Sequence, residues 1–234
     1  MASTSGLPNP AGCGFHHGGG EFGAAVSVAA GLADLALAVD ELGGARVPAA
    51  CCGVYAMRPT AGVLPLEGTS TASHSLAAPA LLAADPGVLL RAGQALRLPA
   101  GSAGDVAHYL VAEDFFAACG PEMQTALPAV VAAVKRWAGP DQAQGLSLSD
   151  WVYHRVTSVR AFLPPPAAGQ PGSEAGNGRT GQQPRAVLAA LAAAAEAVRR
   201  WEFCQLHGDW VAAQPSGSLE PEVLSYWQQA QQVR

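Results

Sequence analysis

The sequence predicts a protein of the α/β class. Stretches in which apolar residues recur at helical spacing are separated by short apolar runs, which are typical of buried strands. Half of the 234 residues are hydrophobic, which is enough apolar side-chain volume for a substantial core. We therefore expect helices and strands that form one large domain or two small ones.

The expected N-terminal elements surround a pair of glycines. After a Gly/Pro-rich N-terminal loop, alanines and valines predict a helix over residues 21–33, with Gly31 as its terminator. The apolar run 35–39 predicts a short strand that enters a turn at Gly43 and Gly44. A glycine pair marks either a tight turn or a place where another group comes close to the main chain.

Capping residues and apolar periodicity predict the later elements. Asp85 followed by Pro86 is a typical helix start, with the aspartate as N-cap and the proline in the first turn. The pattern then predicts a helix over 88–96, a strand over 108–112, a helix that begins at Pro128, and a helix over 188–204.

A segment without large apolar side chains divides the chain. Residues 164–184 are dense in Pro, Gly and Gln, so they predict a disordered insert. The expected organisation is a partial α/β core over residues 1–163, this insert, and a helical continuation over 185–234.

Composition excludes several classes of function. Only 13% of residues are charged, the net charge is −5, and no Lys/Arg cluster occurs, which argues against a nucleic-acid surface. The five cysteines lack paired C-x-x-C spacing, which favours reduced thiols in an intracellular compartment. The apolar run 23–39 is interrupted by Asp34 and is shorter than the ~20 residues of a membrane span.

No cofactor or metal is expected. The stretch GGGEFG has the spacing of a dinucleotide-binding loop, but the PAGCGFHH that precedes it is not the required hydrophobic strand. His16 and His17 are adjacent and have no carboxylate or thiol pair nearby, so they are a poor metal site.

Several motifs in order resemble the amidase signature family and, within it, the plant amidase-1 and Toc64 branch. They read HHGGGEFGAAVSVAAG, LADLALAVDELGGARVPA, CCGVYAMRPTAG, SLAAPALLAADPGVLLRAG and RRWEFCQLHGDWVAA. The resemblance implies an α/β amidase-signature fold, with a mixed central sheet flanked by helices, that is truncated at both its N- and C-terminal ends. A sheet that lacks strands exposes its edges, so we expect marginal stability or a partner that covers the exposed face.

The same resemblance implies a catalytic site whose side chains are lost. The family hydrolyses amides with a Ser–Ser–Lys triad, and backbone N–H groups of a glycine turn form the oxyanion hole. The nucleophile position falls on Gly44 and the bridging-serine position on Gly20. The family's lysine precedes the glycine loops, whereas Lys135 is the first lysine of this chain.

The turn beside the nucleophile position also departs from the family. Glu41 and Leu42 stand where Thr and Gly are usual, so that with Gly43 they form a degenerate oxyanion turn. A carboxylate there opposes a developing negative charge unless it points away. Asp40 and Arg46 flank the turn, and we expect them to form a charge pair with a structural role.

These observations lead to a main hypothesis and two alternatives. The main hypothesis is a catalytically inactive amidase-like domain, a binding or scaffold module as in Toc64-type receptors. The alternatives are a truncated amidase that hydrolyses small carboxamides and a residual hydrolase that uses Cys52 as its nucleophile. For Cys51 and Cys52, however, the expected role is that of buried, unreactive thiols. His207 and Asp209 resemble a base and its orienter, but packing and helix termination are the expected roles. The expected partners are a protein or a small amide ligand, and the expected location is cytoplasmic or plastid-associated.

Overall fold

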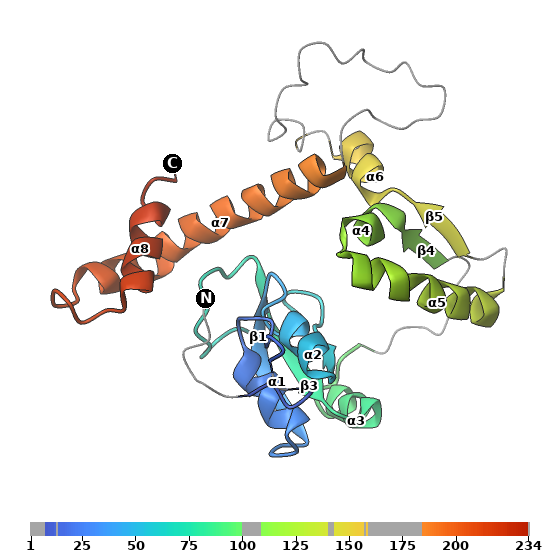
Figure 1. Ribbon diagram of the computed structural model, residues 1–234. Coiled ribbons are helices and arrows are strands. Elements are labelled where there is room, and N and C mark those ends of the chain that lie inside the picture. Colours follow the sequence, from blue (N-terminus) through green and yellow to red (C-terminus); the bar gives the residue numbers. More distant parts are fainter. Residues whose placement is uncertain are drawn as a thin grey trace, which may run out of the picture. The chain divides into compact units, whose positions relative to one another are not determined.

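The computed structural model describes residues 8–12, 14–99, 109–139, 143–156, 158 and 184–233 (Figure 1). The chain forms two compact units, Met1–Gly101 with Ala197–Arg234, and Ser102–Glu196. Residues 164–183 of the predicted insert lie outside the described residues. The boundaries 1–163 and 185–234 therefore remain predictions.

The first unit is built on a three-stranded antiparallel sheet with strand order β1-β3-β2. Helices accompany this sheet, and the C-terminal part of a long helix adds to the same unit. Its elements are α1 (Phe22–Ala29), β1 (Leu35–Glu41), α2 (Arg46–Cys52), β2 (Tyr55–Met57), β3 (Ala77–Ala83), α3 (Pro86–Ala95), α7 (Pro184–Ala212, from Ala197 onward) and α8 (Pro221–Ala230).

The central strand β3 is buried along its whole length. Because side chains alternate between the two faces of a strand, Ala80 and Leu82 join one core with α1 and α2. Leu81 and Ala83 face the other side and pack with Leu89 of α3. Helices therefore cover both faces of β3, which explains why this strand is continuously apolar.

The N-terminal elements lie close to the predicted ranges. The first helix ends at Ala29, four residues earlier than expected, because Gly31 turns the chain with φ +70°. The predicted strand runs on to Glu41. The expected cap of α3 is confirmed, since Asp85 Oδ1 accepts a hydrogen bond from the backbone N–H of Val88 at 3.2 Å.

Among its described residues, the second unit contains a two-stranded parallel sheet, three complete helices and the N-terminal part of α7, up to Glu196. Its elements are β4 (Tyr109–Ala112), α4 (Glu113–Ala118), α5 (Pro121–Ala138), β5 (Ala143–Leu146) and α6 (Leu148–Arg155). The predicted strand over 108–112 corresponds to β4, and its first residue, His108, lies outside the described residues.

The prediction that a helix begins at Pro128 is wrong. Helix α5 begins at Pro121, after Gly120 as N-cap, and Pro128 lies inside it. Pro121 is the better start because N–H groups in the first turn of a helix have no partner within the helix, so a proline there loses no hydrogen bond. Glu122 also places a negative charge at the positive end of the helix.

The C-terminal helix is longer than expected. Helix α7 spans Pro184–Ala212, so it passes through His207 and does not end at Cys204. The prediction that His207 takes part in helix termination is therefore wrong. Within the described ranges, neither α7 nor any other helix is long and apolar enough to cross a membrane.

Candidate functional site

The two glycine loops meet backbone to backbone. The Glu21 N–H donates to the Gly44 carbonyl oxygen at 2.8 Å. A Cβ atom built on Gly20 would stand 2.6 Å from that oxygen and 2.8 Å from the Gly44 Cα atom. A Cβ atom built on Gly18 would likewise stand 2.9 Å from the backbone nitrogen of Pro48 in α2. The group that approaches these glycines is therefore the main chain of the other loop.

The turn after β1 has a left-handed backbone at two residues, and one of them is a leucine where the family resemblance predicts glycine. Leu42 has φ +53° and Gly43 has φ +92°, and the Gly44 N–H donates to the Glu41 carbonyl oxygen at 3.0 Å. For a leucine this region costs on the order of 1 kcal/mol. The chain therefore retains a turn shaped for two glycines, with a strained leucine in it.

Asp40 anchors this turn from inside. Its carboxylate is fully buried and accepts hydrogen bonds from the Gly43 N–H at 2.9 Å, the Arg46 N–H at 3.1 Å and Arg46 Nε at 2.8 Å. Burial raises the pKa of Asp40, but the hydrogen bonds from the Arg46 side chain and from both backbone N–H groups outweigh it. The pKa of Asp40 is therefore held below its ordinary value.

Glu41 is held by the loop before β3 and by α7. One carboxylate oxygen accepts hydrogen bonds from Thr71 Oγ1 at 2.7 Å and from the Ala72 N–H at 3.0 Å. The other accepts from Arg199 Nε, with which it forms an ion pair. The Glu41 carboxylate is therefore paired with a guanidinium of the same unit.

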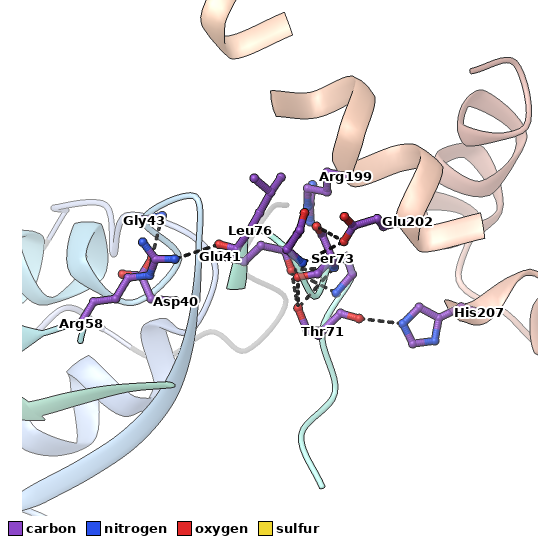
Figure 2. A network of polar contacts seen from close by, with 12 residues as sticks. Asp40, Glu41, Gly43, Arg58, Thr71, Ser73, Leu76, Arg199, Glu202 and His207 are labelled. Atoms are coloured by element: carbon purple, nitrogen blue, oxygen red, sulfur yellow. Dashed lines mark hydrogen bonds and ion pairs between the residues drawn. The ribbon is translucent and has the colours of Figure 1, made fainter. Parts of the chain in front are cut away.

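Helix α7 makes two further polar contacts with the same loop (Figure 2). Ser73 Oγ donates to a carboxylate oxygen of Glu202 at 2.6 Å, and the Ser75 N–H donates to the same oxygen at 3.0 Å. His207 Nε2 lies 2.7 Å from the Thr71 carbonyl oxygen. Because a carbonyl oxygen only accepts, Nε2 is the donor. Together with the Arg199–Glu41 pair, these contacts form what we call the α7 clamp.

Sequence reasoning did not predict the α7 clamp. Arg199, Glu202 and His207 all belong to the motif RRWEFCQLHGDW, which carried part of the family resemblance. Residues three and four apart lie on one helix face, so their spacing of three and then five residues puts them broadly on one side. Other polar residues of α7, such as Arg200 and Gln205, lie between them, so this spacing alone did not single them out.

A pocket of about 360 Å³ opens where these segments meet. Gly20 and Gly44 lie in its wall, together with residues of the loop before β3, of α7 and of α8. All of the lining residues belong to the first unit. The positions that the resemblance assigns to the two serines therefore border one cavity.

Other candidate residues lie outside this pocket. Cys52 is 4% exposed and packs in the core with α1, and burial raises the pKa of its thiol. Cys51 is exposed, contrary to the expectation that both thiols are buried, because it lies on the outer side of α2. His16 Nδ1 accepts a hydrogen bond from the Gly18 N–H, so it stabilises the glycine loop. Among the described residues, no group of three His, Cys, Asp or Glu side chains is placed to hold a metal.

Comparison with known proteins identifies the segment that carries the two glycine loops. The family profile described as Amidase matches residues 7–85. Over these residues the chain is similar to the amidase family. The match contains α1, the turn after β1 and all three strands of the sheet, so the pocket described above lies partly within this segment.

Plant proteins are similar over most of this amidase-like chain. The mitochondrial Outer envelope protein 64 of Arabidopsis thaliana is 31% identical over 194 residues, which is 82% of this chain and 30% of that protein. The Translocon at the outer membrane of chloroplasts 64 of Pisum sativum is 29% identical over 83% of this chain and 31% of its own length. Amidase 1 of Arabidopsis thaliana is 28% identical over 88% of this chain and 45% of its own length. The chain thus spans less than half the length of each of these relatives.

A solved structure supports the fold. A crystal structure of an amidase superposes with a TM-score of 0.66 at 18% sequence identity, covering 96% of this chain and 43% of that one. At this identity the likeness concerns the fold alone. It confirms the expected α/β amidase fold.

Proposed function

We propose that this chain is an amidase-like domain that binds a ligand or partner and does not hydrolyse amides. The observation that carries the proposal is the contact between Gly20 and Gly44, the positions that resemble the bridging serine and the nucleophile. Glycine has no hydroxyl group with which to attack a carbonyl or to relay a proton. In another serine hydrolase, removal of the nucleophile costs about 10⁶ in turnover.

Neither the cysteines of α2 nor the Glu41 carboxylate is placed to substitute for the nucleophile, and the hydroxyl of Thr71, which lines the pocket with Ser70, already donates to Glu41. The pocket lining contains neither Cys51 nor Cys52, and the Cys52 thiol is buried with a raised pKa, which disfavours the reactive thiolate. The Glu41 carboxylate is already occupied by Arg199 and by the loop before β3. These arrangements support the proposal that the pocket binds a ligand without hydrolysing it.

A scaffold role is supported by the names of the relatives. Two of the relatives above are named as an envelope protein and as a translocon component, and a third is named as an amidase. We propose that this chain has a binding or scaffold role and is associated with a plastid, as the name of the chloroplast relative suggests. Imaging of a fluorescent fusion in plastid-containing cells tests the location, and a purely cytoplasmic signal contradicts it.

Ammonia release tests the absence of hydrolysis. The purified chain is incubated with phenylacetamide and with indole-3-acetamide, and ammonia is measured against a buffer blank, with Arabidopsis Amidase 1 as the positive control. We expect no release above the blank, from the chain or from Gly44→Ser, because the bridging position still lacks a hydroxyl. Release that scales with chain concentration overturns the proposal, and its loss in Cys52→Ala assigns the activity to that thiol.

A further inference from the structure

The pocket beside the two glycines has the size of a small-molecule site. Its volume of about 360 Å³ lies at the lower end of the range for ligand pockets. It is bordered by both glycine loops, so a ligand there contacts backbone as well as side chains. The chemistry of its walls indicates which class of ligand it takes.

The charged groups of the wall favour a cation. Glu21 and Glu41 contribute two carboxylates and Arg199 contributes one guanidinium, which leaves a net charge of −1 when the pocket histidine is neutral. The guanidinium is bonded to Glu41, so an anion competes with an existing ion pair. Helix α1 begins at Phe22 and presents a positive end there, but Glu21 stands at its N-cap and offsets that end.

Aromatic rings complete the wall. Phe203 and Trp210 both line the pocket, and both come from α7. The faces of aromatic rings attract ammonium groups, most strongly in the case of tryptophan. Carboxylates and aromatic side chains around one cavity are a combination that binds organic ammonium ions.

We propose that this pocket binds a small organic ammonium compound, with the charged nitrogen between Glu21 and Trp210. This inference rests on the proposed function, since a domain without a nucleophile retains its ligand unchanged. It differs from that proposal in naming a cation, rather than a neutral carboxamide, as the preferred ligand.

Three probes of similar shape separate charge from size. Binding of 2-phenylethylamine, phenylacetamide and phenylacetate to the full chain is measured by isothermal titration calorimetry at pH 8, where an imidazole is neutral and an alkylamine is charged. We expect the amine to bind about tenfold more tightly than the amide and to weaken as salt is added. Equal or tighter binding of the amide or the carboxylate overturns the inference, as does an absence of saturable amine binding.

Two tryptophans on α7 provide a matched pair of variants. Trp210 is 56% exposed and lines the pocket, whereas Trp201 is 52% exposed and does not. They are nine residues apart, which places them on opposite sides of the helix. We expect Trp210→Ala to weaken amine binding about fivefold and Trp201→Ala to leave it unchanged, with both helical by circular dichroism.

A charge-removing variant tests the carboxylate. Glu21→Gln keeps the size of the side chain and is expected to weaken the amine about fivefold without changing amide binding. If Trp210→Ala and Glu21→Gln both bind the amine as the unmodified chain does, the inference is wrong. Ammonia release from phenylacetamide is a separate measurement, so failure of the cation inference is distinguishable from failure of the proposed function.

Discussion

The closest backbone approach in the site predicts a large penalty for a single methyl group. Substitution Gly20→Ala places a Cβ atom 2.6 Å from the Gly44 carbonyl oxygen and 2.8 Å from its Cα atom. Both neighbours are backbone atoms, so no flexible side chain can move aside. The Gly20 φ of +43° adds a conformational cost for any residue other than glycine.

The expected size of the effect comes from these two contributions. The left-handed backbone costs a non-glycine residue on the order of 1 kcal/mol. Displacing packed backbone to relieve the overlap costs a further 1–3 kcal/mol, roughly the penalty of overpacking a core. We therefore expect Gly20→Ala to lower the free energy of unfolding by about 2–4 kcal/mol, which is a large share of the stability of an ordinary domain.

Gly19→Ala is the matched control for this experiment. Gly19 also has a left-handed φ, +87°, but a Cβ atom there meets nothing within 4 Å. It carries the conformational cost without the overlap. Urea unfolding followed by circular dichroism gives both free energies. If Gly20→Ala is no more destabilising than Gly19→Ala, the two glycine loops do not make the contact on which the proposed function rests.

Three further predictions concern the turn and the α7 clamp. Leu42→Gly relieves a left-handed leucine, so urea unfolding should show a gain of about 0.5–1 kcal/mol, and a loss contradicts the strain. Asp40→Asn should cost about 2–3 kcal/mol at pH 7, because it weakens the hydrogen bonds to Arg46. The pKa of Asp40 is lowered by folding, so its stabilisation is complete above about pH 4 and is lost as pH falls through the folded-state pKa. The free energies of unfolding of the unmodified chain and of Asp40→Asn should therefore converge only in strong acid. Ser73→Ala removes a hydrogen bond to the Glu202 carboxylate and should cost about 1–2 kcal/mol near neutral pH and less in acid; a cost that does not depend on pH contradicts this.

Local sequence patterns predicted those helices and strands whose ends are determined by residues nearby in the sequence. The cap at Asp85 and the strand that leads into the glycine turn depend on side chains within a few positions, and both lie where expected. The start at Pro128 failed because a proline inside a helix and a proline in its first turn look alike when the preceding turn is also helical. The helix predicted over 188–204 was too short because the helix continues through Gly208 to Ala212, and a glycine lowers helix propensity without ending a helix.

The α7 clamp is the part that local patterns could not predict. Glu41 and Arg199 are 158 positions apart, and Ser73 and Glu202 are 129 apart. Such pairings depend on how the helix docks on the loop before β3, which no periodicity encodes. The family resemblance indicated that the motif around Glu202 matters, but it assigned no contact to that residue.

The two positions that the resemblance assigns to serines, Gly20 and Gly44, are not equivalent in this structure. A Cβ atom on Gly44 would lie 3.2 Å from the Glu41 carbonyl oxygen, a contact that a small adjustment relieves, and Gly44 is outside the left-handed region. Gly20 has both the left-handed backbone and the overlap with Gly44. A hydroxyl can therefore return at the nucleophile position far more easily than at the bridging position. Since a nucleophilic serine without its proton relay is weakly reactive, the backbone contact at Gly20 is the greater obstacle to restoring hydrolysis by substitution.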